Sequence, residues 1–133
     1  MILAIDTASD IKAVALFWPK KIQEVISWQG NEIDPLEKID QLFKLKKIIL
    51  KDIKLIVINR GPGSFTGVRL GVTIANTFSY SSKIPILGFI NKENVDILEL
   101  AKYGFVHREK AKIQIIKPFY GRKPNINKSK KSV

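Results

Sequence analysis

INRGPGSFTGVRLGVTIAN, residues 58–76, joins the end of an apolar run to a glycine-rich loop and then to a segment with helical spacing. The order of strand, glycine loop and helix is the layout of a phosphate-binding loop. The spacing fits neither standard motif. No lysine follows a glycine in the loop, as Walker A requires, and Gly67 comes one residue late for the dinucleotide fingerprint.

Two interpretations of this loop remain open. In the first, a helix N-terminus with capping hydroxyls and two flanking arginines binds an anion. That candidate site consists of Arg60, Gly61, Gly63, Ser64, Thr66 and Arg69. In the second, the two glycines of the loop only form a tight turn from strand to helix, with a proline fixing the backbone between them.

The hydrophobic pattern on either side predicts an α/β fold. Strands are expected at residues 1–6, 12–18, 24–29, 54–59 and 84–89, with helices from residue 36 to about 50 and from 67 to 80. Tight connections between the first three strands favour an antiparallel meander, and the later units are right-handed crossovers parallel to the first strand. The result is a mixed five-stranded sheet with flanking helices.

Beyond residue 89 the pattern weakens. We expect a helix at 94–103, a short strand at 112–116, and disorder in about the last ten residues. This divides the chain into an N-terminal domain of residues 1–90, a reduced segment of 91–117 and a basic tail of 118–133.

The first helix has a strong start signal, because Asp34 suits the N-cap, Pro35 the first turn and Glu37 a capping box. Its apolar stripe contains Leu36, Ile39, Leu42 and Phe43.

The second helix carries small residues at every fourth position. These are Gly67, Gly71, Ala75 and Ser79, and the other face is apolar. A glycine inside a helix costs roughly 0.5–1 kcal/mol relative to alanine, so two on one stripe indicate that something packs very close. It is either the chain's own sheet or a partner's helix.

Composition limits the chemistry that the chain can perform. There is no cysteine and a single histidine, His107, which excludes Cys-ligated metals and a two-histidine metal site. Asp6 and Thr7 end the first strand; they either organise a turn or serve a phosphate or metal site. We expect no metal and no cofactor.

No apolar run is long enough to span a membrane and the first residues do not resemble a signal peptide, so a cytoplasmic protein is expected.

The net charge of +11 is concentrated toward the C-terminus. Residues 108–133 hold nine Lys or Arg and one acid. This segment is either a solvated tail or a site for polyanions such as RNA, in which Tyr120, Arg122 and Lys123 are candidate contacts.

Three stretches resemble the TsaB (YeaZ) family of proteins of tRNA threonylcarbamoyladenosine synthesis. They are ILAIDTAS near the start, RGPGSFTGVRLGVTIAN in the loop and helix, and IPILGF. A fainter match, KPFYGRKP, is similar to the family's C-terminal motif, with Gly121 where leucine is usual. The resemblance covers about residues 1–90. It implies one RNase H-like lobe of the actin-like ATPase superfold, with the second lobe largely missing.

The resemblance also implies a noncatalytic scaffold that binds a TsaD-like subunit through the two helices, with a TsaE-like ATPase joining the assembly. The implied contact residues are Leu36, Ile39, Phe43, Gly67, Val68, Gly71, Val72 and Ala75. A homodimer through the same helices is expected when the partner is absent. Two alternatives remain: a small ATP-binding enzyme using Asp6 and the glycine loop, and a tRNA-binding module acting through the basic tail.

Overall fold

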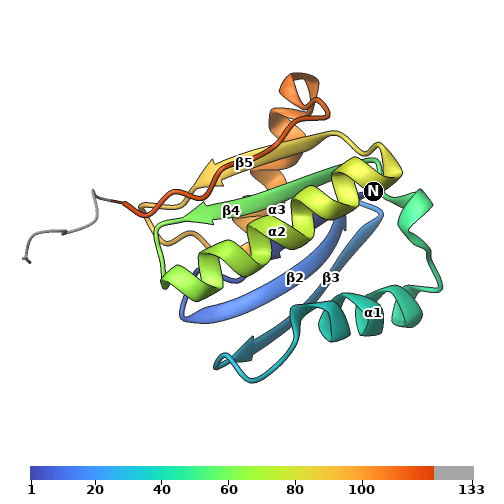
Figure 1. The fold of residues 1–133 in the computed structure, drawn as a ribbon. Coiled ribbons are helices and arrows are strands. Elements are labelled where there is room, and N and C mark those ends of the chain that lie inside the picture. The colour runs from blue at the N-terminus through green and yellow to red at the C-terminus, as the bar shows by residue number, and fades with distance from the viewer. Residues whose placement is uncertain (122–133) are drawn as a thin grey trace, which may run out of the picture.

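A computed structural model describes residues 1–121, which form one five-stranded sheet in the order β3-β2-β1-β4-β5 (Figure 1). The strands are β1 (Ile2–Asp6), β2 (Ile11–Trp18), β3 (Ile22–Gln29), β4 (Leu55–Gly61) and β5 (Ile86–Ile90). The first three pair antiparallel, whereas β4 lies parallel to β1 and β5 parallel to β4. The predicted α/β class and mixed sheet are confirmed.

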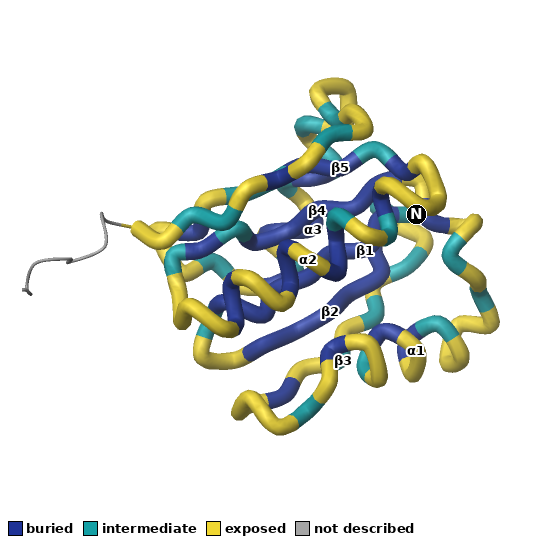
Figure 2. The backbone as a smooth tube through the Cα atoms, viewed as in Figure 1, coloured by how far each residue is buried: buried dark blue, intermediate teal, exposed yellow. Residues whose placement is uncertain are grey.

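Helices cover both faces of the sheet, so the core has two layers. α1 (Pro35–Lys46) and α2 (Phe65–Ser82) pack on the face that carries Leu3 and Ile5 of β1. α3 (Ile97–Val106) packs on the opposite face, which carries Ile2 and Ala4. Strand alternation therefore sends apolar side chains to both sides of β1, and Figure 2 shows this strand buried along its length.

The helix ends differ from the predicted ones for local reasons. α1 stops at Lys46 because Lys47 adopts a left-handed conformation and its N–H bonds the carbonyls of Phe43 and Lys44. The short helix η1 (Leu50–Asp52) follows, so the prediction of one helix to about residue 50 is wrong. α3 begins at Ile97 rather than at 94, because the Asp96 side chain caps it.

The strand predicted at 112–116 does not form. After η2 (Arg108–Lys110), the chain makes one isolated bridge, between Lys112 and Ile86. Residues 111–121, here called the C-terminal strap, then run along β5 toward the glycine loop (Figure 1). The Asn76 side chain holds the strap by bonding both the N–H and the C=O of Ile116, at 2.9 Å each. The predicted disorder of the last ten residues lies outside the described residues.

Candidate functional site

The glycine loop is filled by the chain's own backbone. Ser64 caps α2, with its Oγ accepting from the N–H of Gly67 at 3.0 Å. A Cβ on Gly63 would overlap the Ala8 carbonyl, and a Cβ on Gly61, where φ is +116°, would overlap the carbonyl of Phe119. The loop needs glycine because the turn after β1 and the C-terminal strap both press against it. This packing favours the tight-turn interpretation.

The Asp6 carboxylate organises the turn between β1 and β2. One oxygen accepts from the backbone N–H of Ala8 and of Ser9 and from the Asn59 side chain, each at 3.0 Å, and the other accepts from the Ser9 hydroxyl at 2.7 Å. Asp6 is only 3% exposed. Both carboxylate oxygens therefore accept hydrogen bonds from this turn or from Asn59. This favours a turn-forming role for Asp6 over binding of a metal or phosphate.

Thr7 joins this turn to α2. Its hydroxyl donates to the Gly67 carbonyl, and its side chain is fully buried against Gly71. Thr7 therefore positions the helix and does not face a ligand cleft.

The two arginines beside the loop make other contacts. Arg60 Nε donates to the carbonyl of Lys117 at 2.8 Å, and the carbonyl of Arg60 accepts from the N–H of Phe119 at 2.8 Å. The Arg69 guanidinium lies 5.0 Å from the centre of the Phe65 ring. Neither converges with Thr66, which is exposed, on a common point. Anion binding by this loop stays a prediction that these contacts do not favour.

Tyr120 belongs to the same packing. Its ring stacks on Phe65, with centroids 4.9 Å apart and planes 22° from parallel. This contact brings the strap onto the first turn of α2. Arg122 and Lys123, the other candidate RNA contacts, lie outside the described residues.

The five α2 residues predicted to contact a partner face the sheet instead. Gly67, Val68, Gly71, Val72 and Ala75 are all buried in the single chain. The small stripe allows α2 to approach the turn after β1. These five residues are covered by this chain's own atoms, so the prediction that they contact a partner stays a prediction that the packing does not favour.

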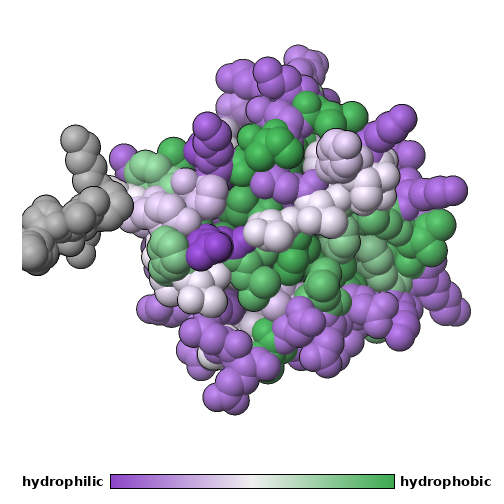
Figure 3. All heavy atoms as spheres, in the orientation of Figure 1, coloured by the Kyte–Doolittle hydropathy of each residue, from purple (hydrophilic) through white to green (hydrophobic). Residues whose placement is uncertain are grey.

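The three predicted contact residues of α1 line an apolar groove between α1 and α2. Leu36, Ile39 and Phe43 border a hollow of about 460 Å³. Its other lining residues are Asp40, Lys44, Ile48, Ile49, Leu50 and Phe78. Figure 3 shows apolar surface in the strip between the two helices. Here Leu36 is 45% exposed and Ile49 62%, which leaves unburied apolar surface on this face.

Within residues 1–121, no helix has the length and apolar character needed to cross a membrane. The same residues contain no group of three or more His, Asp or Glu side chains placed to hold a metal ion.

Comparison with known proteins connects this lobe to tRNA modification proteins. A family model described as TsaD, tRNA N6-adenosine threonylcarbamoyltransferase, matches residues 33–93. The tRNA threonylcarbamoyladenosine biosynthesis protein TsaB of Buchnera aphidicola (subspecies Schizaphis graminum) is 40% identical over 90 residues, which is 66% of this chain and 43% of that protein. The TsaB protein of Bacillus subtilis is 36% identical over 88 residues, or 64% of this chain and 38% of that protein.

Over about two thirds of its length, this chain is a member of the TsaB (YeaZ) family. The solved structure titled YeaZ from Pseudomonas aeruginosa has the same fold, with a TM-score of 0.63 at 24% identity over 82% of this chain and 49% of that one. The chain thus spans about two fifths of the length of the TsaB proteins it matches.

Some residues of the groove, the turn after β1 and the strap were not singled out from the sequence. Ile48, Ile49 and Phe78 line the groove, and Asn59 and Asn76 fix the turn and the strap. Ile48 and Ile49 follow the end of α1, and the helix stripe does not continue through them. The asparagines act through contacts more than 35 residues away in sequence, which no local pattern displays.

Proposed function

We propose that this chain is a noncatalytic partner subunit in tRNA threonylcarbamoyladenosine synthesis and that it binds a TsaD-like subunit. The observation that carries the proposal is the 40% identity to a TsaB protein over 90 residues, which is 66% of this chain. A TsaE-like ATPase is the proposed third component, and homodimerisation is proposed when the TsaD-like subunit is absent.

The groove between α1 and α2 is the proposed contact surface. It presents the exposed apolar side chains of Leu36 on α1 and Ile49 beyond its end, beside the half-buried Phe78 of α2, and burial of such surface favours association. A TsaD-like lobe is a fitting occupant because the family model for TsaD matches residues 33–93, which include both helices. The two proteins therefore share this part of the fold, and related lobes can pair through equivalent helices.

The noncatalytic role is supported by the end of β1. A carboxylate that binds a metal or orients a water directs its lone pairs at that ligand. Both oxygens of Asp6 accept hydrogen bonds from the turn and from Asn59. These contacts count against the alternative of a small ATP-binding enzyme.

A reconstituted reaction tests the proposal. The TsaD-like subunit of the same organism is supplied with tRNA, a TsaE-like ATPase and the activated threonylcarbamoyl donor, with and without this chain. We expect transfer to tRNA only when both this chain and the TsaD-like subunit are present. Transfer by this chain without the TsaD-like subunit, or equal transfer in its absence, would overturn the proposal.

A further inference from the structure

Charge is separated along the strand direction. The parallel strands β1, β4 and β5 all begin at one end of the sheet, near the chain start marked N in Figure 1. The connections at that end are residues 19–21, 47–54, 83–85 and 107–112, and they hold nine Lys or Arg and two acids. The connections at the other end are residues 7–10, 30–34, 62–64 and 91–96, and they hold five acids and one lysine.

Two contacts place residues 107–112 at the end of the sheet where β1, β4 and β5 begin. The Phe105 ring meets Trp18, the final residue of β2, edge to face at 5.0 Å, and Lys112 bridges to Ile86, the first residue of β5. We call the four connections together the basic end. Its cations are Lys20, Lys21, Lys47, Lys51, Lys54, Lys83, Arg108, Lys110 and Lys112.

The cations of the basic end are not neutralised within residues 1–121. The ion pairs formed there are Lys44 with Asp40 and Lys46 with Glu24, and neither includes one of the nine. All nine are exposed. Arg108 is the most constrained, since it donates to the Phe105 carbonyl and stacks on the Phe105 ring. The positive potential of this end is therefore open to solvent.

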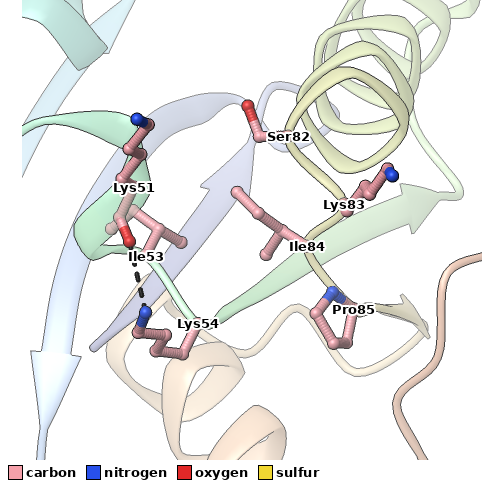
Figure 4. Close-up of a pocket in the computed structure, with 7 residues that line it drawn as sticks. All are labelled: Lys51, Ile53, Lys54, Ser82, Lys83, Ile84 and Pro85. Atoms are coloured by element: carbon pink, nitrogen blue, oxygen red, sulfur yellow. Dashed lines mark hydrogen bonds between the residues drawn. The ribbon is translucent and has the colours of Figure 1, made fainter.

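Three of these lysines surround one hollow, shown in Figure 4. Lys51 and Lys54 come from the chain before β4, and Lys83 from the end of α2, around a cavity of about 320 Å³. Ile53, Ile84 and Pro85 also line it. The Lys54 ammonium donates to the Lys51 carbonyl at 3.4 Å. Burial lowers the pKa of the nearby Met1 amino group, and the charge of Lys54 lowers it further.

We propose that the basic end binds the phosphate backbone of RNA, with the hollow between Lys51, Lys54 and Lys83 as its centre. The inference rests on the proposed function, which supplies a tRNA as the polyanion. Five strands spaced about 4.8 Å apart make this end roughly 20 Å wide, enough to meet several successive phosphates. Lysines bind phosphates as point charges without reading sequence, so the contact positions RNA and does not select it.

Matched variants of the full chain test the inference. The first variant, with Lys51→Gln, Lys54→Gln and Lys83→Gln, removes the three positive charges that surround the hollow. In the control, Lys38→Gln, Lys92→Gln and Lys117→Gln remove the same charge from places nearer the other end of the sheet. The tail beyond residue 121 is identical in both, so its charges cancel from the comparison.

Binding of labelled tRNA is measured by fluorescence anisotropy over a range of salt concentrations. Each lost phosphate contact lowers the slope of log K against log salt by about 0.7–0.9. We expect the hollow variant to lose about two units of slope and roughly 100-fold in affinity at 0.1 M salt. We expect the control to change several-fold at most. Equal losses in both variants, or no binding by the unaltered chain, would overturn the inference.

Pairing with the TsaD-like subunit is measured in parallel without tRNA. Absence of tRNA binding with intact pairing overturns this inference alone. Absence of pairing with tRNA binding that depends on the three lysines overturns the proposed function and leaves the RNA surface supported.

Discussion

Thr7 lies directly against Gly71, so a Cβ at position 71 would overlap the Thr7 hydroxyl oxygen and press on Ile58. Gly71→Ala should therefore destabilise the fold by about 1–3 kcal/mol, although alanine improves helix propensity by about 1 kcal/mol. Urea unfolding measures this change, with Thr73→Ala on the exposed side of α2 as the control. A stability equal to or above that of the unaltered chain would contradict the packing. A bulkier substitution, Gly71→Leu, should unfold the domain rather than only break pairing.

The Asp6 carboxylate should matter for folding. Asp6→Ala removes the acceptor of four hydrogen bonds and leaves the Asn59 amide and two backbone N–H groups without it. We expect a loss of about 2–4 kcal/mol in the free energy of unfolding. Asp10→Ala, on an exposed residue of the same turn, should change it by less than about 0.5 kcal/mol. Equal effects of the two substitutions would rule out the assigned role of Asp6.

The C-terminal strap should detach when Asn76 is shortened. Asn76→Ala removes both hydrogen bonds to Ile116, so the Ile116 amide should exchange with solvent about 5- to 10-fold faster, as expected for a loss of about 1 kcal/mol. Hydrogen exchange read by NMR measures this, with Thr77→Ala as the neighbouring control. Unchanged protection at Ile116 would show that other contacts hold the strap.

The groove between α1 and α2 should tolerate charge in the single chain and not in the complex. Leu36→Glu with Ile49→Glu places two carboxylates on exposed groove positions, so stability should change by less than about 1 kcal/mol. Affinity for the TsaD-like subunit should fall at least 100-fold, because buried unpaired charges are costly. Titration calorimetry measures the affinity. Leu45→Glu changes a 59% exposed leucine of α1 that does not line the groove, and it should bind normally.

The sequence was sufficient for the order and type of the main elements because their periodicity is local. The run before the glycine loop and the capping residues Asp34 and Ser64 mark real boundaries in the structure. Besides the strand expected at 112–116, which does not form, the errors lie where one residue's conformation or cap decides the end of an element. Lys47 ends α1 by adopting a left-handed conformation, which a lysine at this position does not predict.

The orientation of α2 was misjudged because attention went to its small and apolar stripes. The helix also carries Thr66, Arg69, Thr73 and Thr77 at helical spacing, all exposed in the structure, and this polar stripe marks the side toward solvent. The packing of Gly67 and Gly71 against Thr7 shows that the small side is turned to the sheet. The separation of charge between the two ends of the sheet was also not apparent from the sequence, because the nine cations of the basic end are spread over four distant segments.

The proposed function requires that this chain pairs with a TsaD-like subunit. The most direct measurement is the mass of a mixture of the two full chains by size-exclusion chromatography with light scattering at micromolar concentration. We expect one species with the summed mass of one copy of each chain, and loss of that species in the variant with Leu36→Glu and Ile49→Glu. Separate elution of the two unaltered proteins, or a complex that this double variant forms equally well, would contradict it.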